Sequence, residues 1–396
     1  MANVSSSNGL EKRPKLRFPG FDEPWKATAF GDLVHEFSNR TKVEDEDVLL
    51  SAAIEGMFLN TELFGHQRGA SNKGYKKIKY GTMVLSTQNL HLGNANVNQR
   101  FEHGMVSPAY KTYDISGCSI DLIAQWIKSD AAKRFFYYAT TVGASVCRRN
   151  VEWDTLYGQS LFLPSLPEQE KIANLLTLLS NRIEKQRQLI IALKKYKRGV
   201  VDGIFSRKLN FSYPQAWAEL EISELFMPIS DKGYSDKIVL TIVQGEGTMP
   251  RDSVDRRIAY DKSTISSYKR VLPNDFILHL RSFEGGLEIV NEEGVVSPAY
   301  TILRARNEII PLFFYTFFRS YWFINSKLRI SVEGIRDGKS INMNTFWHIK
   351  VPVPSIEEQR HISALISSID NRIKIAEFEY KRLLQIRVGL MQQLFI

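Results

Sequence analysis

Two stretches of the chain decide its fold. The first is PSLPEQEKIANLLTLLSNRIEKQRQLIIALKKYKRGVVDGIF, residues 164–205, and the second is PSIEEQRHISALISSIDNRIKIAEFEYKRLLQIRVGLMQQLF, residues 354–395. They align without a gap at an offset of 190, and 12 of the 42 positions are identical. Self-similarity at a fixed offset is the mark of a duplicated structural unit.

Apolar residues recur in both stretches with a seven-residue period, which predicts a long helix packed along another helix. Prolines stand only at the start of each stretch, where a helix tolerates them. Ser165 with Glu168, and Ser355 with Glu358, are typical of capping boxes. The predicted core of the helix pair is Ile172, Leu176, Leu179, Ile183, Ile190, Leu193, Ile362, Ile366, Ile369, Ile373, Tyr380 and Leu383.

A helix of about 40 residues is about 60 Å long, and it cannot leave such a stripe in water. The two stripes most simply cover each other, and because a folded unit lies between them in the sequence, the pair is expected to be antiparallel. Lys197 and Arg387 occupy the same slot of the two stripes. Two interpretations stay open for this slot: a side chain that extends to water, or a polar layer that sets the register.

The repeat also extends upstream of the helices. Residues 104–110, GMVSPAY, recur as residues 294–300, GVVSPAY, while the regions 34–103 and 226–293 share little beyond an apolar pattern. Within each copy, short strands are predicted at 83–86 and 276–280. Aromatic-rich helical segments follow at 122–138 and 312–323, and we interpret them as core.

The predicted fold class is therefore mixed α/β (α+β), with two globular domains that alternate with two long helices in a pseudo-twofold repeat. The helices are expected to pair as an antiparallel coiled coil. The predicted boundaries are 1–163 and 210–353 for the globular domains, and 164–209 and 354–396 for the helices.

Composition narrows the function classes. The chain has 396 residues, a formal charge of +9 and only two cysteines, Cys118 and Cys147. A disulfide framework or thiolate zinc site is not expected, and a reducing cytoplasm is the default. There is no long apolar run to span a membrane, and residues 1–20 lack the apolar stretch of a signal peptide. The basic charge favours a polyanionic partner only mildly.

No catalytic motif is present in the sequence. There is no GxGxxG after a predicted strand, no HExxH, and no Pro-Pro pair for an Asx-Pro-Pro-aromatic motif. The seven histidines show no metal-ligand spacing, so no metal site is expected. The segment Gly334–Ser340 is one residue short of a Walker A loop and is better interpreted as a basic loop.

Basic side chains gather in loop-like stretches of both copies and could form a groove for phosphates. Most of them, taken singly, fit solvated surface charge equally well. The candidate DNA-binding residues are Arg68, Lys73, Lys76, Lys77, Arg148, Arg149, Arg251, Arg256, Arg257, Lys262, Lys269, Arg270, Arg281, Arg336 and Lys339.

This combination resembles the specificity subunit of a type I restriction–modification system. The resemblance covers the whole chain and is carried by the Ser-Pro-Ala-Tyr block, the Pro-x-x-Glu-Gln helix start and Asn-Arg-Ile at 181–183 and 371–373. The second helix start departs from the first in having Glu357 in place of Pro167.

The resemblance implies a non-catalytic DNA reader in the bacterial or archaeal cytoplasm. Each globular domain would be a target recognition domain for one half of a bipartite, asymmetric sequence on double-stranded DNA. The helices would set the spacer, and about 60 Å corresponds to roughly 17 base pairs. They would also dock two modification subunits, which carry S-adenosylmethionine, so no cofactor is expected in this chain. Restriction (motor-nuclease) subunits would join that core complex.

Two other interpretations remain open from the sequence. One is a coiled-coil adaptor that touches no nucleic acid. The other is a self-sufficient enzyme, which the missing cofactor motifs disfavour. Neither the recognised bases nor the spacer length follows from the sequence.

Overall fold

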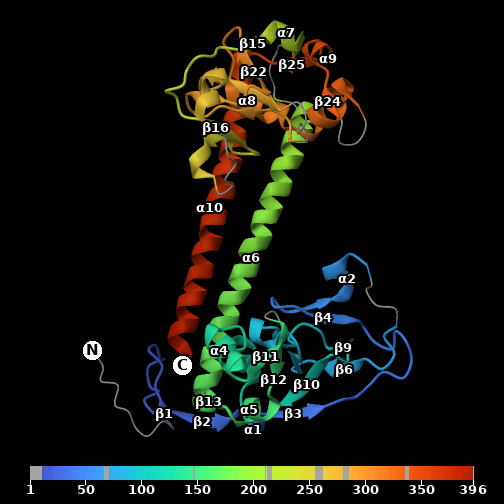
Figure 1. The fold of residues 1–396 in the computed structure, drawn as a ribbon, viewed down its shortest axis with the longest axis vertical. Coiled ribbons are helices and arrows are strands. Elements are labelled where there is room, and N and C mark those ends of the chain that lie inside the picture. The colour runs from blue at the N-terminus through green and yellow to red at the C-terminus, as the bar shows by residue number, and fades with distance from the viewer. Residues whose placement is uncertain are drawn as a thin grey trace. The chain divides into compact units, whose positions relative to one another are not determined.

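The structure is a computed structural model, and it describes residues 11–66, 71–145, 148–209, 211, 216–254, 262–279, 285–334 and 339–395. Within these ranges the side chains of residues 11, 143–145, 148, 262 and 263 are not described. The chain forms two compact units (Figure 1). Unit 1 comprises Met1–Arg187 and Phe378–Ile396, and unit 2 comprises Gln188–Glu377. Each long helix is shared between the units.

Unit 1 is a mixed body of short strands and helices that ends in the first long helix. Its strands are β1 (Glu11–Lys12), β2 (Trp25–Ala29), β3 (Val34–Phe37), β4 (Leu50–Ala52), β5 (Met57–Leu59), β6 (Lys76–Lys79), β7 (Met83–Ser86), β8 (Ala95–Val97), β9 (His103–Val106), β10 (Tyr110–Ile115), β11 (Thr140–Ser145), β12 (Arg148–Val151) and β13 (Ser160–Leu163). Its helices are α1 (Phe30–Leu33), α2 (Asn60–Phe64), η1 (Leu90–Leu92), α3 (Ile120–Trp126), α4 (Asp130–Tyr138), α5 (Trp153–Gly158) and the start of α6 (Leu166–Phe205).

Unit 2 repeats this order of elements. Its strands are β14 (Ala218–Glu221), β15 (Phe226–Ile229), β16 (Leu240–Val243), β17 (Gly247–Pro250), β18 (Lys269–Val271), β19 (Phe276–His279), β20 (Glu288–Ile289), β21 (Gly294–Val296), β22 (Tyr300–Ala305), β23 (Val332–Glu333), β24 (Ser340–Ile341) and β25 (Lys350–Val353). Its helices are α7 (Ile222–Leu225), η2 (Arg251–Ser253), η3 (Lys262–Ser267), α8 (Pro311–Phe318), η4 (Phe323–Lys327), η5 (Leu328–Ser331), α9 (Met343–Trp347) and the start of α10 (Ile356–Leu394).

The sheets of the two units correspond one to one, except that β1 adds a third strand to the β2-β13 pair of unit 1. The four-stranded sheet has the order β3-β10-β7-β8 in unit 1 and β15-β22-β19-β20 in unit 2, with antiparallel neighbours throughout. The pairs β4-β5, β6-β9, β11-β12 and β2-β13 match β16-β17, β18-β21, β23-β24 and β14-β25. The predicted strands at 83–86 and 276–280 are β7 and β19, the latter described to His279. The predicted mixed α/β repeat is confirmed.

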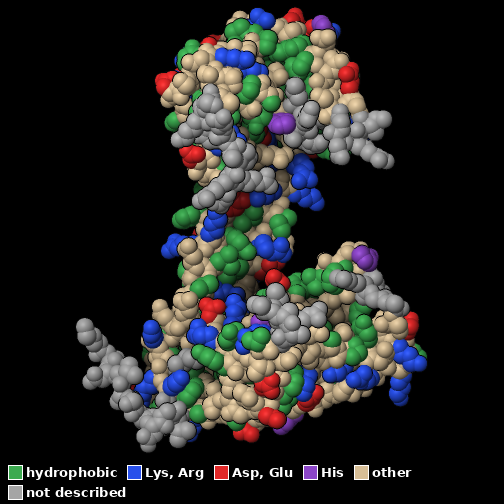
Figure 2. Space-filling model, viewed as in Figure 1, with side chains coloured by type: hydrophobic (Ala, Val, Ile, Leu, Met, Phe, Trp, Pro, Cys, Tyr) green, Lys and Arg blue, Asp and Glu red, His purple; other side chains and the backbone are tan. Residues whose placement is uncertain are grey.

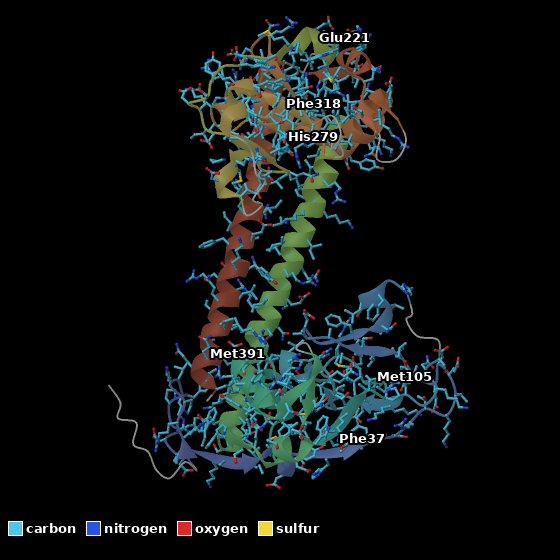
Figure 3. All side chains as sticks on the ribbon, in the orientation of Figure 1. Phe37, Met105, Glu221, His279, Phe318 and Met391 are labelled. Atoms are coloured by element: carbon cyan, nitrogen blue, oxygen red, sulfur yellow. The ribbon has the colours of Figure 1, made fainter. Side chains whose placement is uncertain are left out.

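Aromatic side chains fill the core of each globular body. In unit 2, Phe313, Phe314, Phe317 and Phe318 are all fully buried, and the ring of Phe317 lies 5.0 Å from that of Phe205 on α6. Figure 3 labels Phe318 in the globular body of unit 2. The aromatic-rich helices are therefore core elements, as predicted.

The long helices begin at Leu166 and Ile356, two residues after the predicted boundaries, and segments of the two run side by side in each unit (Figure 1). All twelve residues predicted for the helix-pair core are buried or half-buried. Ion pairs also join the helices, and their order shows that the helices run antiparallel: Arg182 with Glu379 in unit 1, and Lys194 with Glu377 and Lys197 with Asp370 in unit 2.

The shared glutamine at each helix start connects the helix to its globular body. Gln169 is 3% exposed, accepts a hydrogen bond from the Ser119 N–H at 2.8 Å, and donates to the Pro164 carbonyl at 2.9 Å. Gln359 makes the same two contacts, with the Ile310 N–H at 3.0 Å and the Pro354 carbonyl at 3.0 Å. The motif therefore orients the helix against the body.

One detail of the helix starts differs from the prediction. Ser355 Oγ accepts a hydrogen bond from the Glu358 N–H at 3.2 Å, as a capping residue does. The fully buried Glu168 carboxylate instead pairs with the guanidinium of Arg17 at 2.7 and 2.9 Å. Arg17 thus takes up the carboxylate that was predicted to cap the helix. The N-terminal segment is also held at the end of α10, where the Gln393 carbonyl accepts a hydrogen bond from the Leu16 N–H.

Gly104 and Gly294, the first residues of the repeated GxVSPAY blocks, mark a close approach of two chain segments. A Cβ atom at Gly104 would lie 2.4 Å from Leu50 Cδ1, and one at Gly294 would lie 2.6 Å from the Ile238 carbonyl oxygen. The Val48 carbonyl oxygen would also lie 3.0 Å from the Gly104 Cβ, so at both positions a larger residue would meet backbone as well as side chain.

We predict that Phe317→Ala lowers the free energy of unfolding by about 3–5 kcal/mol, since a fully buried aromatic side chain leaves a cavity. Tyr321→Ala is the matched control, because Tyr321 is 68% exposed and should change stability by less than about 0.5 kcal/mol. Urea unfolding followed by tryptophan fluorescence measures both. Equal effects of the two substitutions would contradict the packing described here.

Candidate nucleic-acid interface

Five of the predicted DNA-binding residues lie outside the described residues: Arg68, Arg256, Arg257, Arg281 and Arg336. The backbones of Arg148 and Lys262 lie in β12 and η3, but their side chains are not described. Figure 2 shows the Lys and Arg side chains interspersed with Asp and Glu on the face of each unit drawn there.

Two of the candidate lysines are structural. Lys76 is 6% exposed, and its Nζ donates to the Tyr110 carbonyl at 2.7 Å. Lys269, at the equivalent place in unit 2, donates to the Tyr300 carbonyl at 2.6 Å. Burial lowers the pKa of both ammonium groups. These contacts tie β6 to the start of β10 and β18 to the start of β22. A phosphate contact of either lysine stays a prediction.

Other candidates lie at the surface but have partners in the protein. Lys77 pairs with Glu46, and this contact is the main reason why the pKa of the Glu46 carboxyl falls to about 2. Arg149 donates to the Thr140 carbonyl at 2.7 Å. Arg270 pairs with Glu293 at 2.9 Å. A phosphate would have to compete with these contacts.

Arg251 is half-buried at the start of η2, while Lys73 and Lys339 are exposed. No ion pair is described for Lys73 or Lys339 within the ranges that the structure covers. These two lysines are the described candidates that best fit a phosphate contact.

The structure also reveals cationic residues that the sequence did not single out. In unit 1, Arg100 pairs with Glu62 at 2.6 Å and stacks on Phe101 at 4.9 Å. In unit 2, a cavity of about 860 Å³ lies between α8 and the helix pair. Its charged lining is Lys194, Lys197, Arg198, Asp202, Arg319, Asp370 and Lys374. These residues come from segments far apart in the sequence, so loop-based reasoning could not group them.

The structure places the potential metal-ligating side chains and one cysteine among the described residues. Among them there is no group of three or more His, Cys, Asp or Glu side chains that could hold a metal ion. Cys118 is a free thiol, and burial raises its pKa to about 11, which keeps it protonated. In the parts of the chain that were described, no helix is long and apolar enough to cross a membrane.

The comparisons with known proteins agree with this geometry. Residues 215–385 match the family model of the type I restriction modification DNA specificity domain. The repeat at an offset of 190 places the same unit in the first half of the chain. The second half of the chain thus carries this specificity domain, and the chain is similar to type I specificity subunits.

Two curated relatives come from an archaeon and a bacterium. The chain is similar to the putative type I restriction enzyme MjaX specificity subunit of Methanocaldococcus jannaschii, with 23% identity over 59% of the chain. It is also similar to the type I restriction enzyme EcoBI specificity subunit of Escherichia coli, with 24% identity over 58% of the chain. In both cases the match spans 57% of the relative's own length.

Solved structures share the fold across nearly the whole chain. The HsdS subunit from Thermoanaerobacter tengcongensis gives a TM-score of 0.51 at 14% identity, covering 97% of this chain and 98% of that one. The S subunit from M. genitalium gives 0.54 at 16% identity, covering 97% and 99%. A chain from a structural study of type I R-M complex assembly gives 0.57 at 15% identity, covering 95% and 97%.

We predict that Lys73→Gln changes DNA binding and that Lys76→Met changes stability. Loss of the exposed Lys73 charge should leave stability unchanged and reduce the slope of log affinity against log salt for DNA by about 0.9. Lys76→Met removes the buried donor to Tyr110 and should cost about 1–3 kcal/mol of stability. DNA titrations of the assembled complex at several salt concentrations, with thermal unfolding, test this pair. A flatter salt slope for Lys76→Met at unchanged stability would refute the structural role of Lys76.

Proposed function

We propose that the chain is the DNA-recognition subunit of a type I restriction–modification enzyme. Each globular domain reads one half of a bipartite, asymmetric target on double-stranded DNA. The observation that carries this proposal is the duplicated scaffold with its one-to-one sheets and different intervening segments. A repeated scaffold places two readers in equivalent settings, while different intervening segments give each its own target.

The segments that differ follow the equivalent hairpins. After β4-β5, unit 1 has the helix α2 (Asn60–Phe64), whereas after β16-β17 unit 2 has the 3₁₀ helices η2 and η3. Elements of different shape on the same sheet framework present different side chains to a duplex. This supports two half-sites of unlike sequence.

The helices are proposed to set the spacer and to dock two modification subunits. Several large apolar side chains on α6 and α10 are exposed although the seam between the helices is covered: Leu178 and Phe378 in unit 1, and Leu189, Ile191, Tyr196 and Ile375 in unit 2. Exposed apolar side chains along a helix pair fit a protein partner. Restriction subunits would join through the resulting core complex.

The chain is proposed to be non-catalytic. Neither copy of the repeat has a cofactor motif in its sequence, so S-adenosylmethionine and the methylation of adenine are assigned to the modification subunits. The family match supports this division of labour, and the bacterial and archaeal relatives support a cytoplasmic restriction system. A coiled-coil adaptor without DNA binding is the competing function, and salt-dependent DNA binding by the chain with its partners distinguishes the two.

We predict that replacing residues 210–353 with the corresponding domain of another family member changes one half-site of the methylated sequence only. The reciprocal control, replacement of residues 1–163, should change the other half-site only. Sequencing of methylated sites in cells that carry each chimera measures both halves. A change in both half-sites from a single replacement would refute modular reading.

A second prediction concerns the spacer. Seven residues inserted after Leu193, matched by seven after Ile373, preserve the seven-residue period and lengthen the helix pair by about 10 Å. The nonspecific spacer should grow by about three base pairs at 3.4 Å per pair, with unchanged half-sites. An unaltered spacer in the methylated sequence, or altered half-sites, would contradict the role assigned to the helices.

A further inference from the structure

The two units carry equivalent cations where the globular body meets the helix pair. Lys128 in unit 1 precedes Ser129, whose Oγ accepts a hydrogen bond from the Ala132 N–H at 3.0 Å. Arg319 in unit 2 precedes Ser320, whose Oγ accepts from the Phe323 N–H at 3.1 Å. Each unit also has a second cation at the slot that the two helix stripes share. This cation is Arg387 in unit 1 and Lys197 in unit 2.

In unit 2 both cations are neutralised from within the protein. Arg319 pairs with the buried Glu288 carboxylate. Lys197 Nζ lies 2.6 and 2.8 Å from the two oxygens of Asp370 across the helix seam. In this unit, the slot thus forms a polar layer between the helices.

Unit 1 lacks both carboxylates. Asn96 stands where unit 2 has Glu288, since both residues pair into the edge of the four-stranded sheet. Ser180 stands where unit 2 has Asp370, at the offset of 190. Lys128 and Arg387 are both half-buried. Among the described residues, neither has an acidic partner within 4 Å of the kind that Asp370 gives Lys197.

The missing carboxylates are reflected in the hydrogen-bond partners and pKa values of Lys128 and Arg387. Lys128 Nζ donates to the carbonyls of Ile54 and Ala95 at 2.8 and 3.0 Å and to Asn96 Oδ1 at 2.5 Å, all neutral acceptors. Burial lowers the pKa of Lys128 to about 8 although the Glu55 carboxylate raises it, and repulsion from Arg387 adds a smaller lowering. Burial also lowers the pKa of Arg387. Arg387 Nε is buried and has no hydrogen-bond acceptor within the described ranges.

A cavity of about 240 Å³ opens at this junction. It is lined by Lys128, Arg387, Ser180 and Gln125. Gln125 is only 8% exposed, and its Oε1 has no partner among the described residues. Its Nε2 donates a long hydrogen bond to Thr177 Oγ1 at 3.4 Å. Because a hydroxyl can also donate, a flip of the amide lets Thr177 donate to Oε1 and turns the NH₂ group toward the cavity.

The remaining charged groups of the wall do not neutralise the pair. Glu55 is exposed at the rim, and Arg100 is held by Glu62 at 2.6 and 2.9 Å. A second hollow of about 340 Å³ shares Lys128 and Arg387 and adds the exposed Arg134. Its one carboxylate among the lining residues, Asp130, is paired with Lys133 at 3.4 Å. Half-buried like charges without a counter-ion are costly, so the junction favours an external anion.

We propose that this cavity of unit 1 binds a small oxyanion of the phosphate class, with Arg387 and Gln125 as hydrogen-bond donors and the charge of Lys128 behind them. A guanidinium suits this ligand because its planar N–H groups match two oxygens of a phosphate. The site does not depend on the DNA-reading function proposed above. The oxyanion comes either from free phosphate or from the DNA backbone, and the two sources give different results below.

The test installs in unit 1 the carboxylate that unit 2 already has. Ser180→Asp places an acid beside Arg387 as Asp370 stands beside Lys197, and Ser180→Asn adds similar bulk without charge. Thermal unfolding of the full chain is measured against inorganic phosphate, with chloride at matched ionic strength as reference. Phosphate also stabilises proteins generally by exclusion from their surface, so the difference between the two variants is the informative quantity.

We expect a saturable rise in the unfolding temperature of the unmodified chain and of Ser180→Asn as phosphate is added. Ser180→Asp should lose this rise and be more stable than Ser180→Asn without phosphate. Arg387→Gln should lose the rise as well. An equal phosphate response in Ser180→Asp and Ser180→Asn, or no saturable response in the unmodified chain, would overturn the proposal.

DNA titrations of the same variants identify the source. If Ser180→Asp also reduces the salt slope of DNA binding by about 0.9 relative to Ser180→Asn, and phosphate competes with DNA, the oxyanion is a backbone phosphate. If the phosphate response disappears while DNA binding is unchanged, the site takes free phosphate. Both results support the oxyanion site. If the phosphate titrations refute that site, the DNA-reading proposal still stands.

Discussion

The apolar stripe along each long helix is the constraint on which the rest of the structure depends. A helix of 40 residues with one apolar face cannot remain exposed to water, and in each unit the stripe of α6 packs against that of α10. The antiparallel direction follows because a complete globular body lies between the helices in the sequence. In unit 1, the end of α10 joins the core through Met391 (Figure 3), Leu394 and Phe395. Neither globular core is complete without residues from both helices.

The residues that the two copies share mostly build this scaffold. Gln169 and Gln359 fasten the helix starts, and Gly104 and Gly294 allow a close approach of segments. The carbonyls of Tyr110 and Tyr300 accept hydrogen bonds from the lysines of β6 and β18. The motifs that carry the family resemblance are thus architectural. Recognition is left to the segments that differ between the copies, which is why two similar bodies are suited to unlike targets.

The sequence predicted the features that depend on period and repetition. The existence of the two long helices, their antiparallel seam, the strands β7 and β19 and the aromatic core all follow from local pattern or from the offset of 190. Which charged side chains are buried could not be predicted, because burial is a property of the folded chain. Lys76 lies in a basic cluster of the sequence, yet its ammonium group is buried against the Tyr110 carbonyl.

The cationic junction of unit 1 shows the same limit. Lys128 and Arg387 are far apart in the sequence, and nothing in either local stretch brings them together. The repeat does contain a usable signal, since Ser180 and Asp370 occupy equivalent positions beside the shared basic slot. Only the structure shows that this difference leaves one pair of cations neutralised and the other not.

The central claim is that two unlike readers stand on one duplicated scaffold. Genome-wide mapping of methylated adenines in the source strain, with and without this chain, tests it most directly. The account predicts that methylation lost with the chain falls on one motif with two different half-sites and a nonspecific spacer of fixed length. A palindromic or uninterrupted motif, or methylation unchanged by loss of the chain, would contradict it.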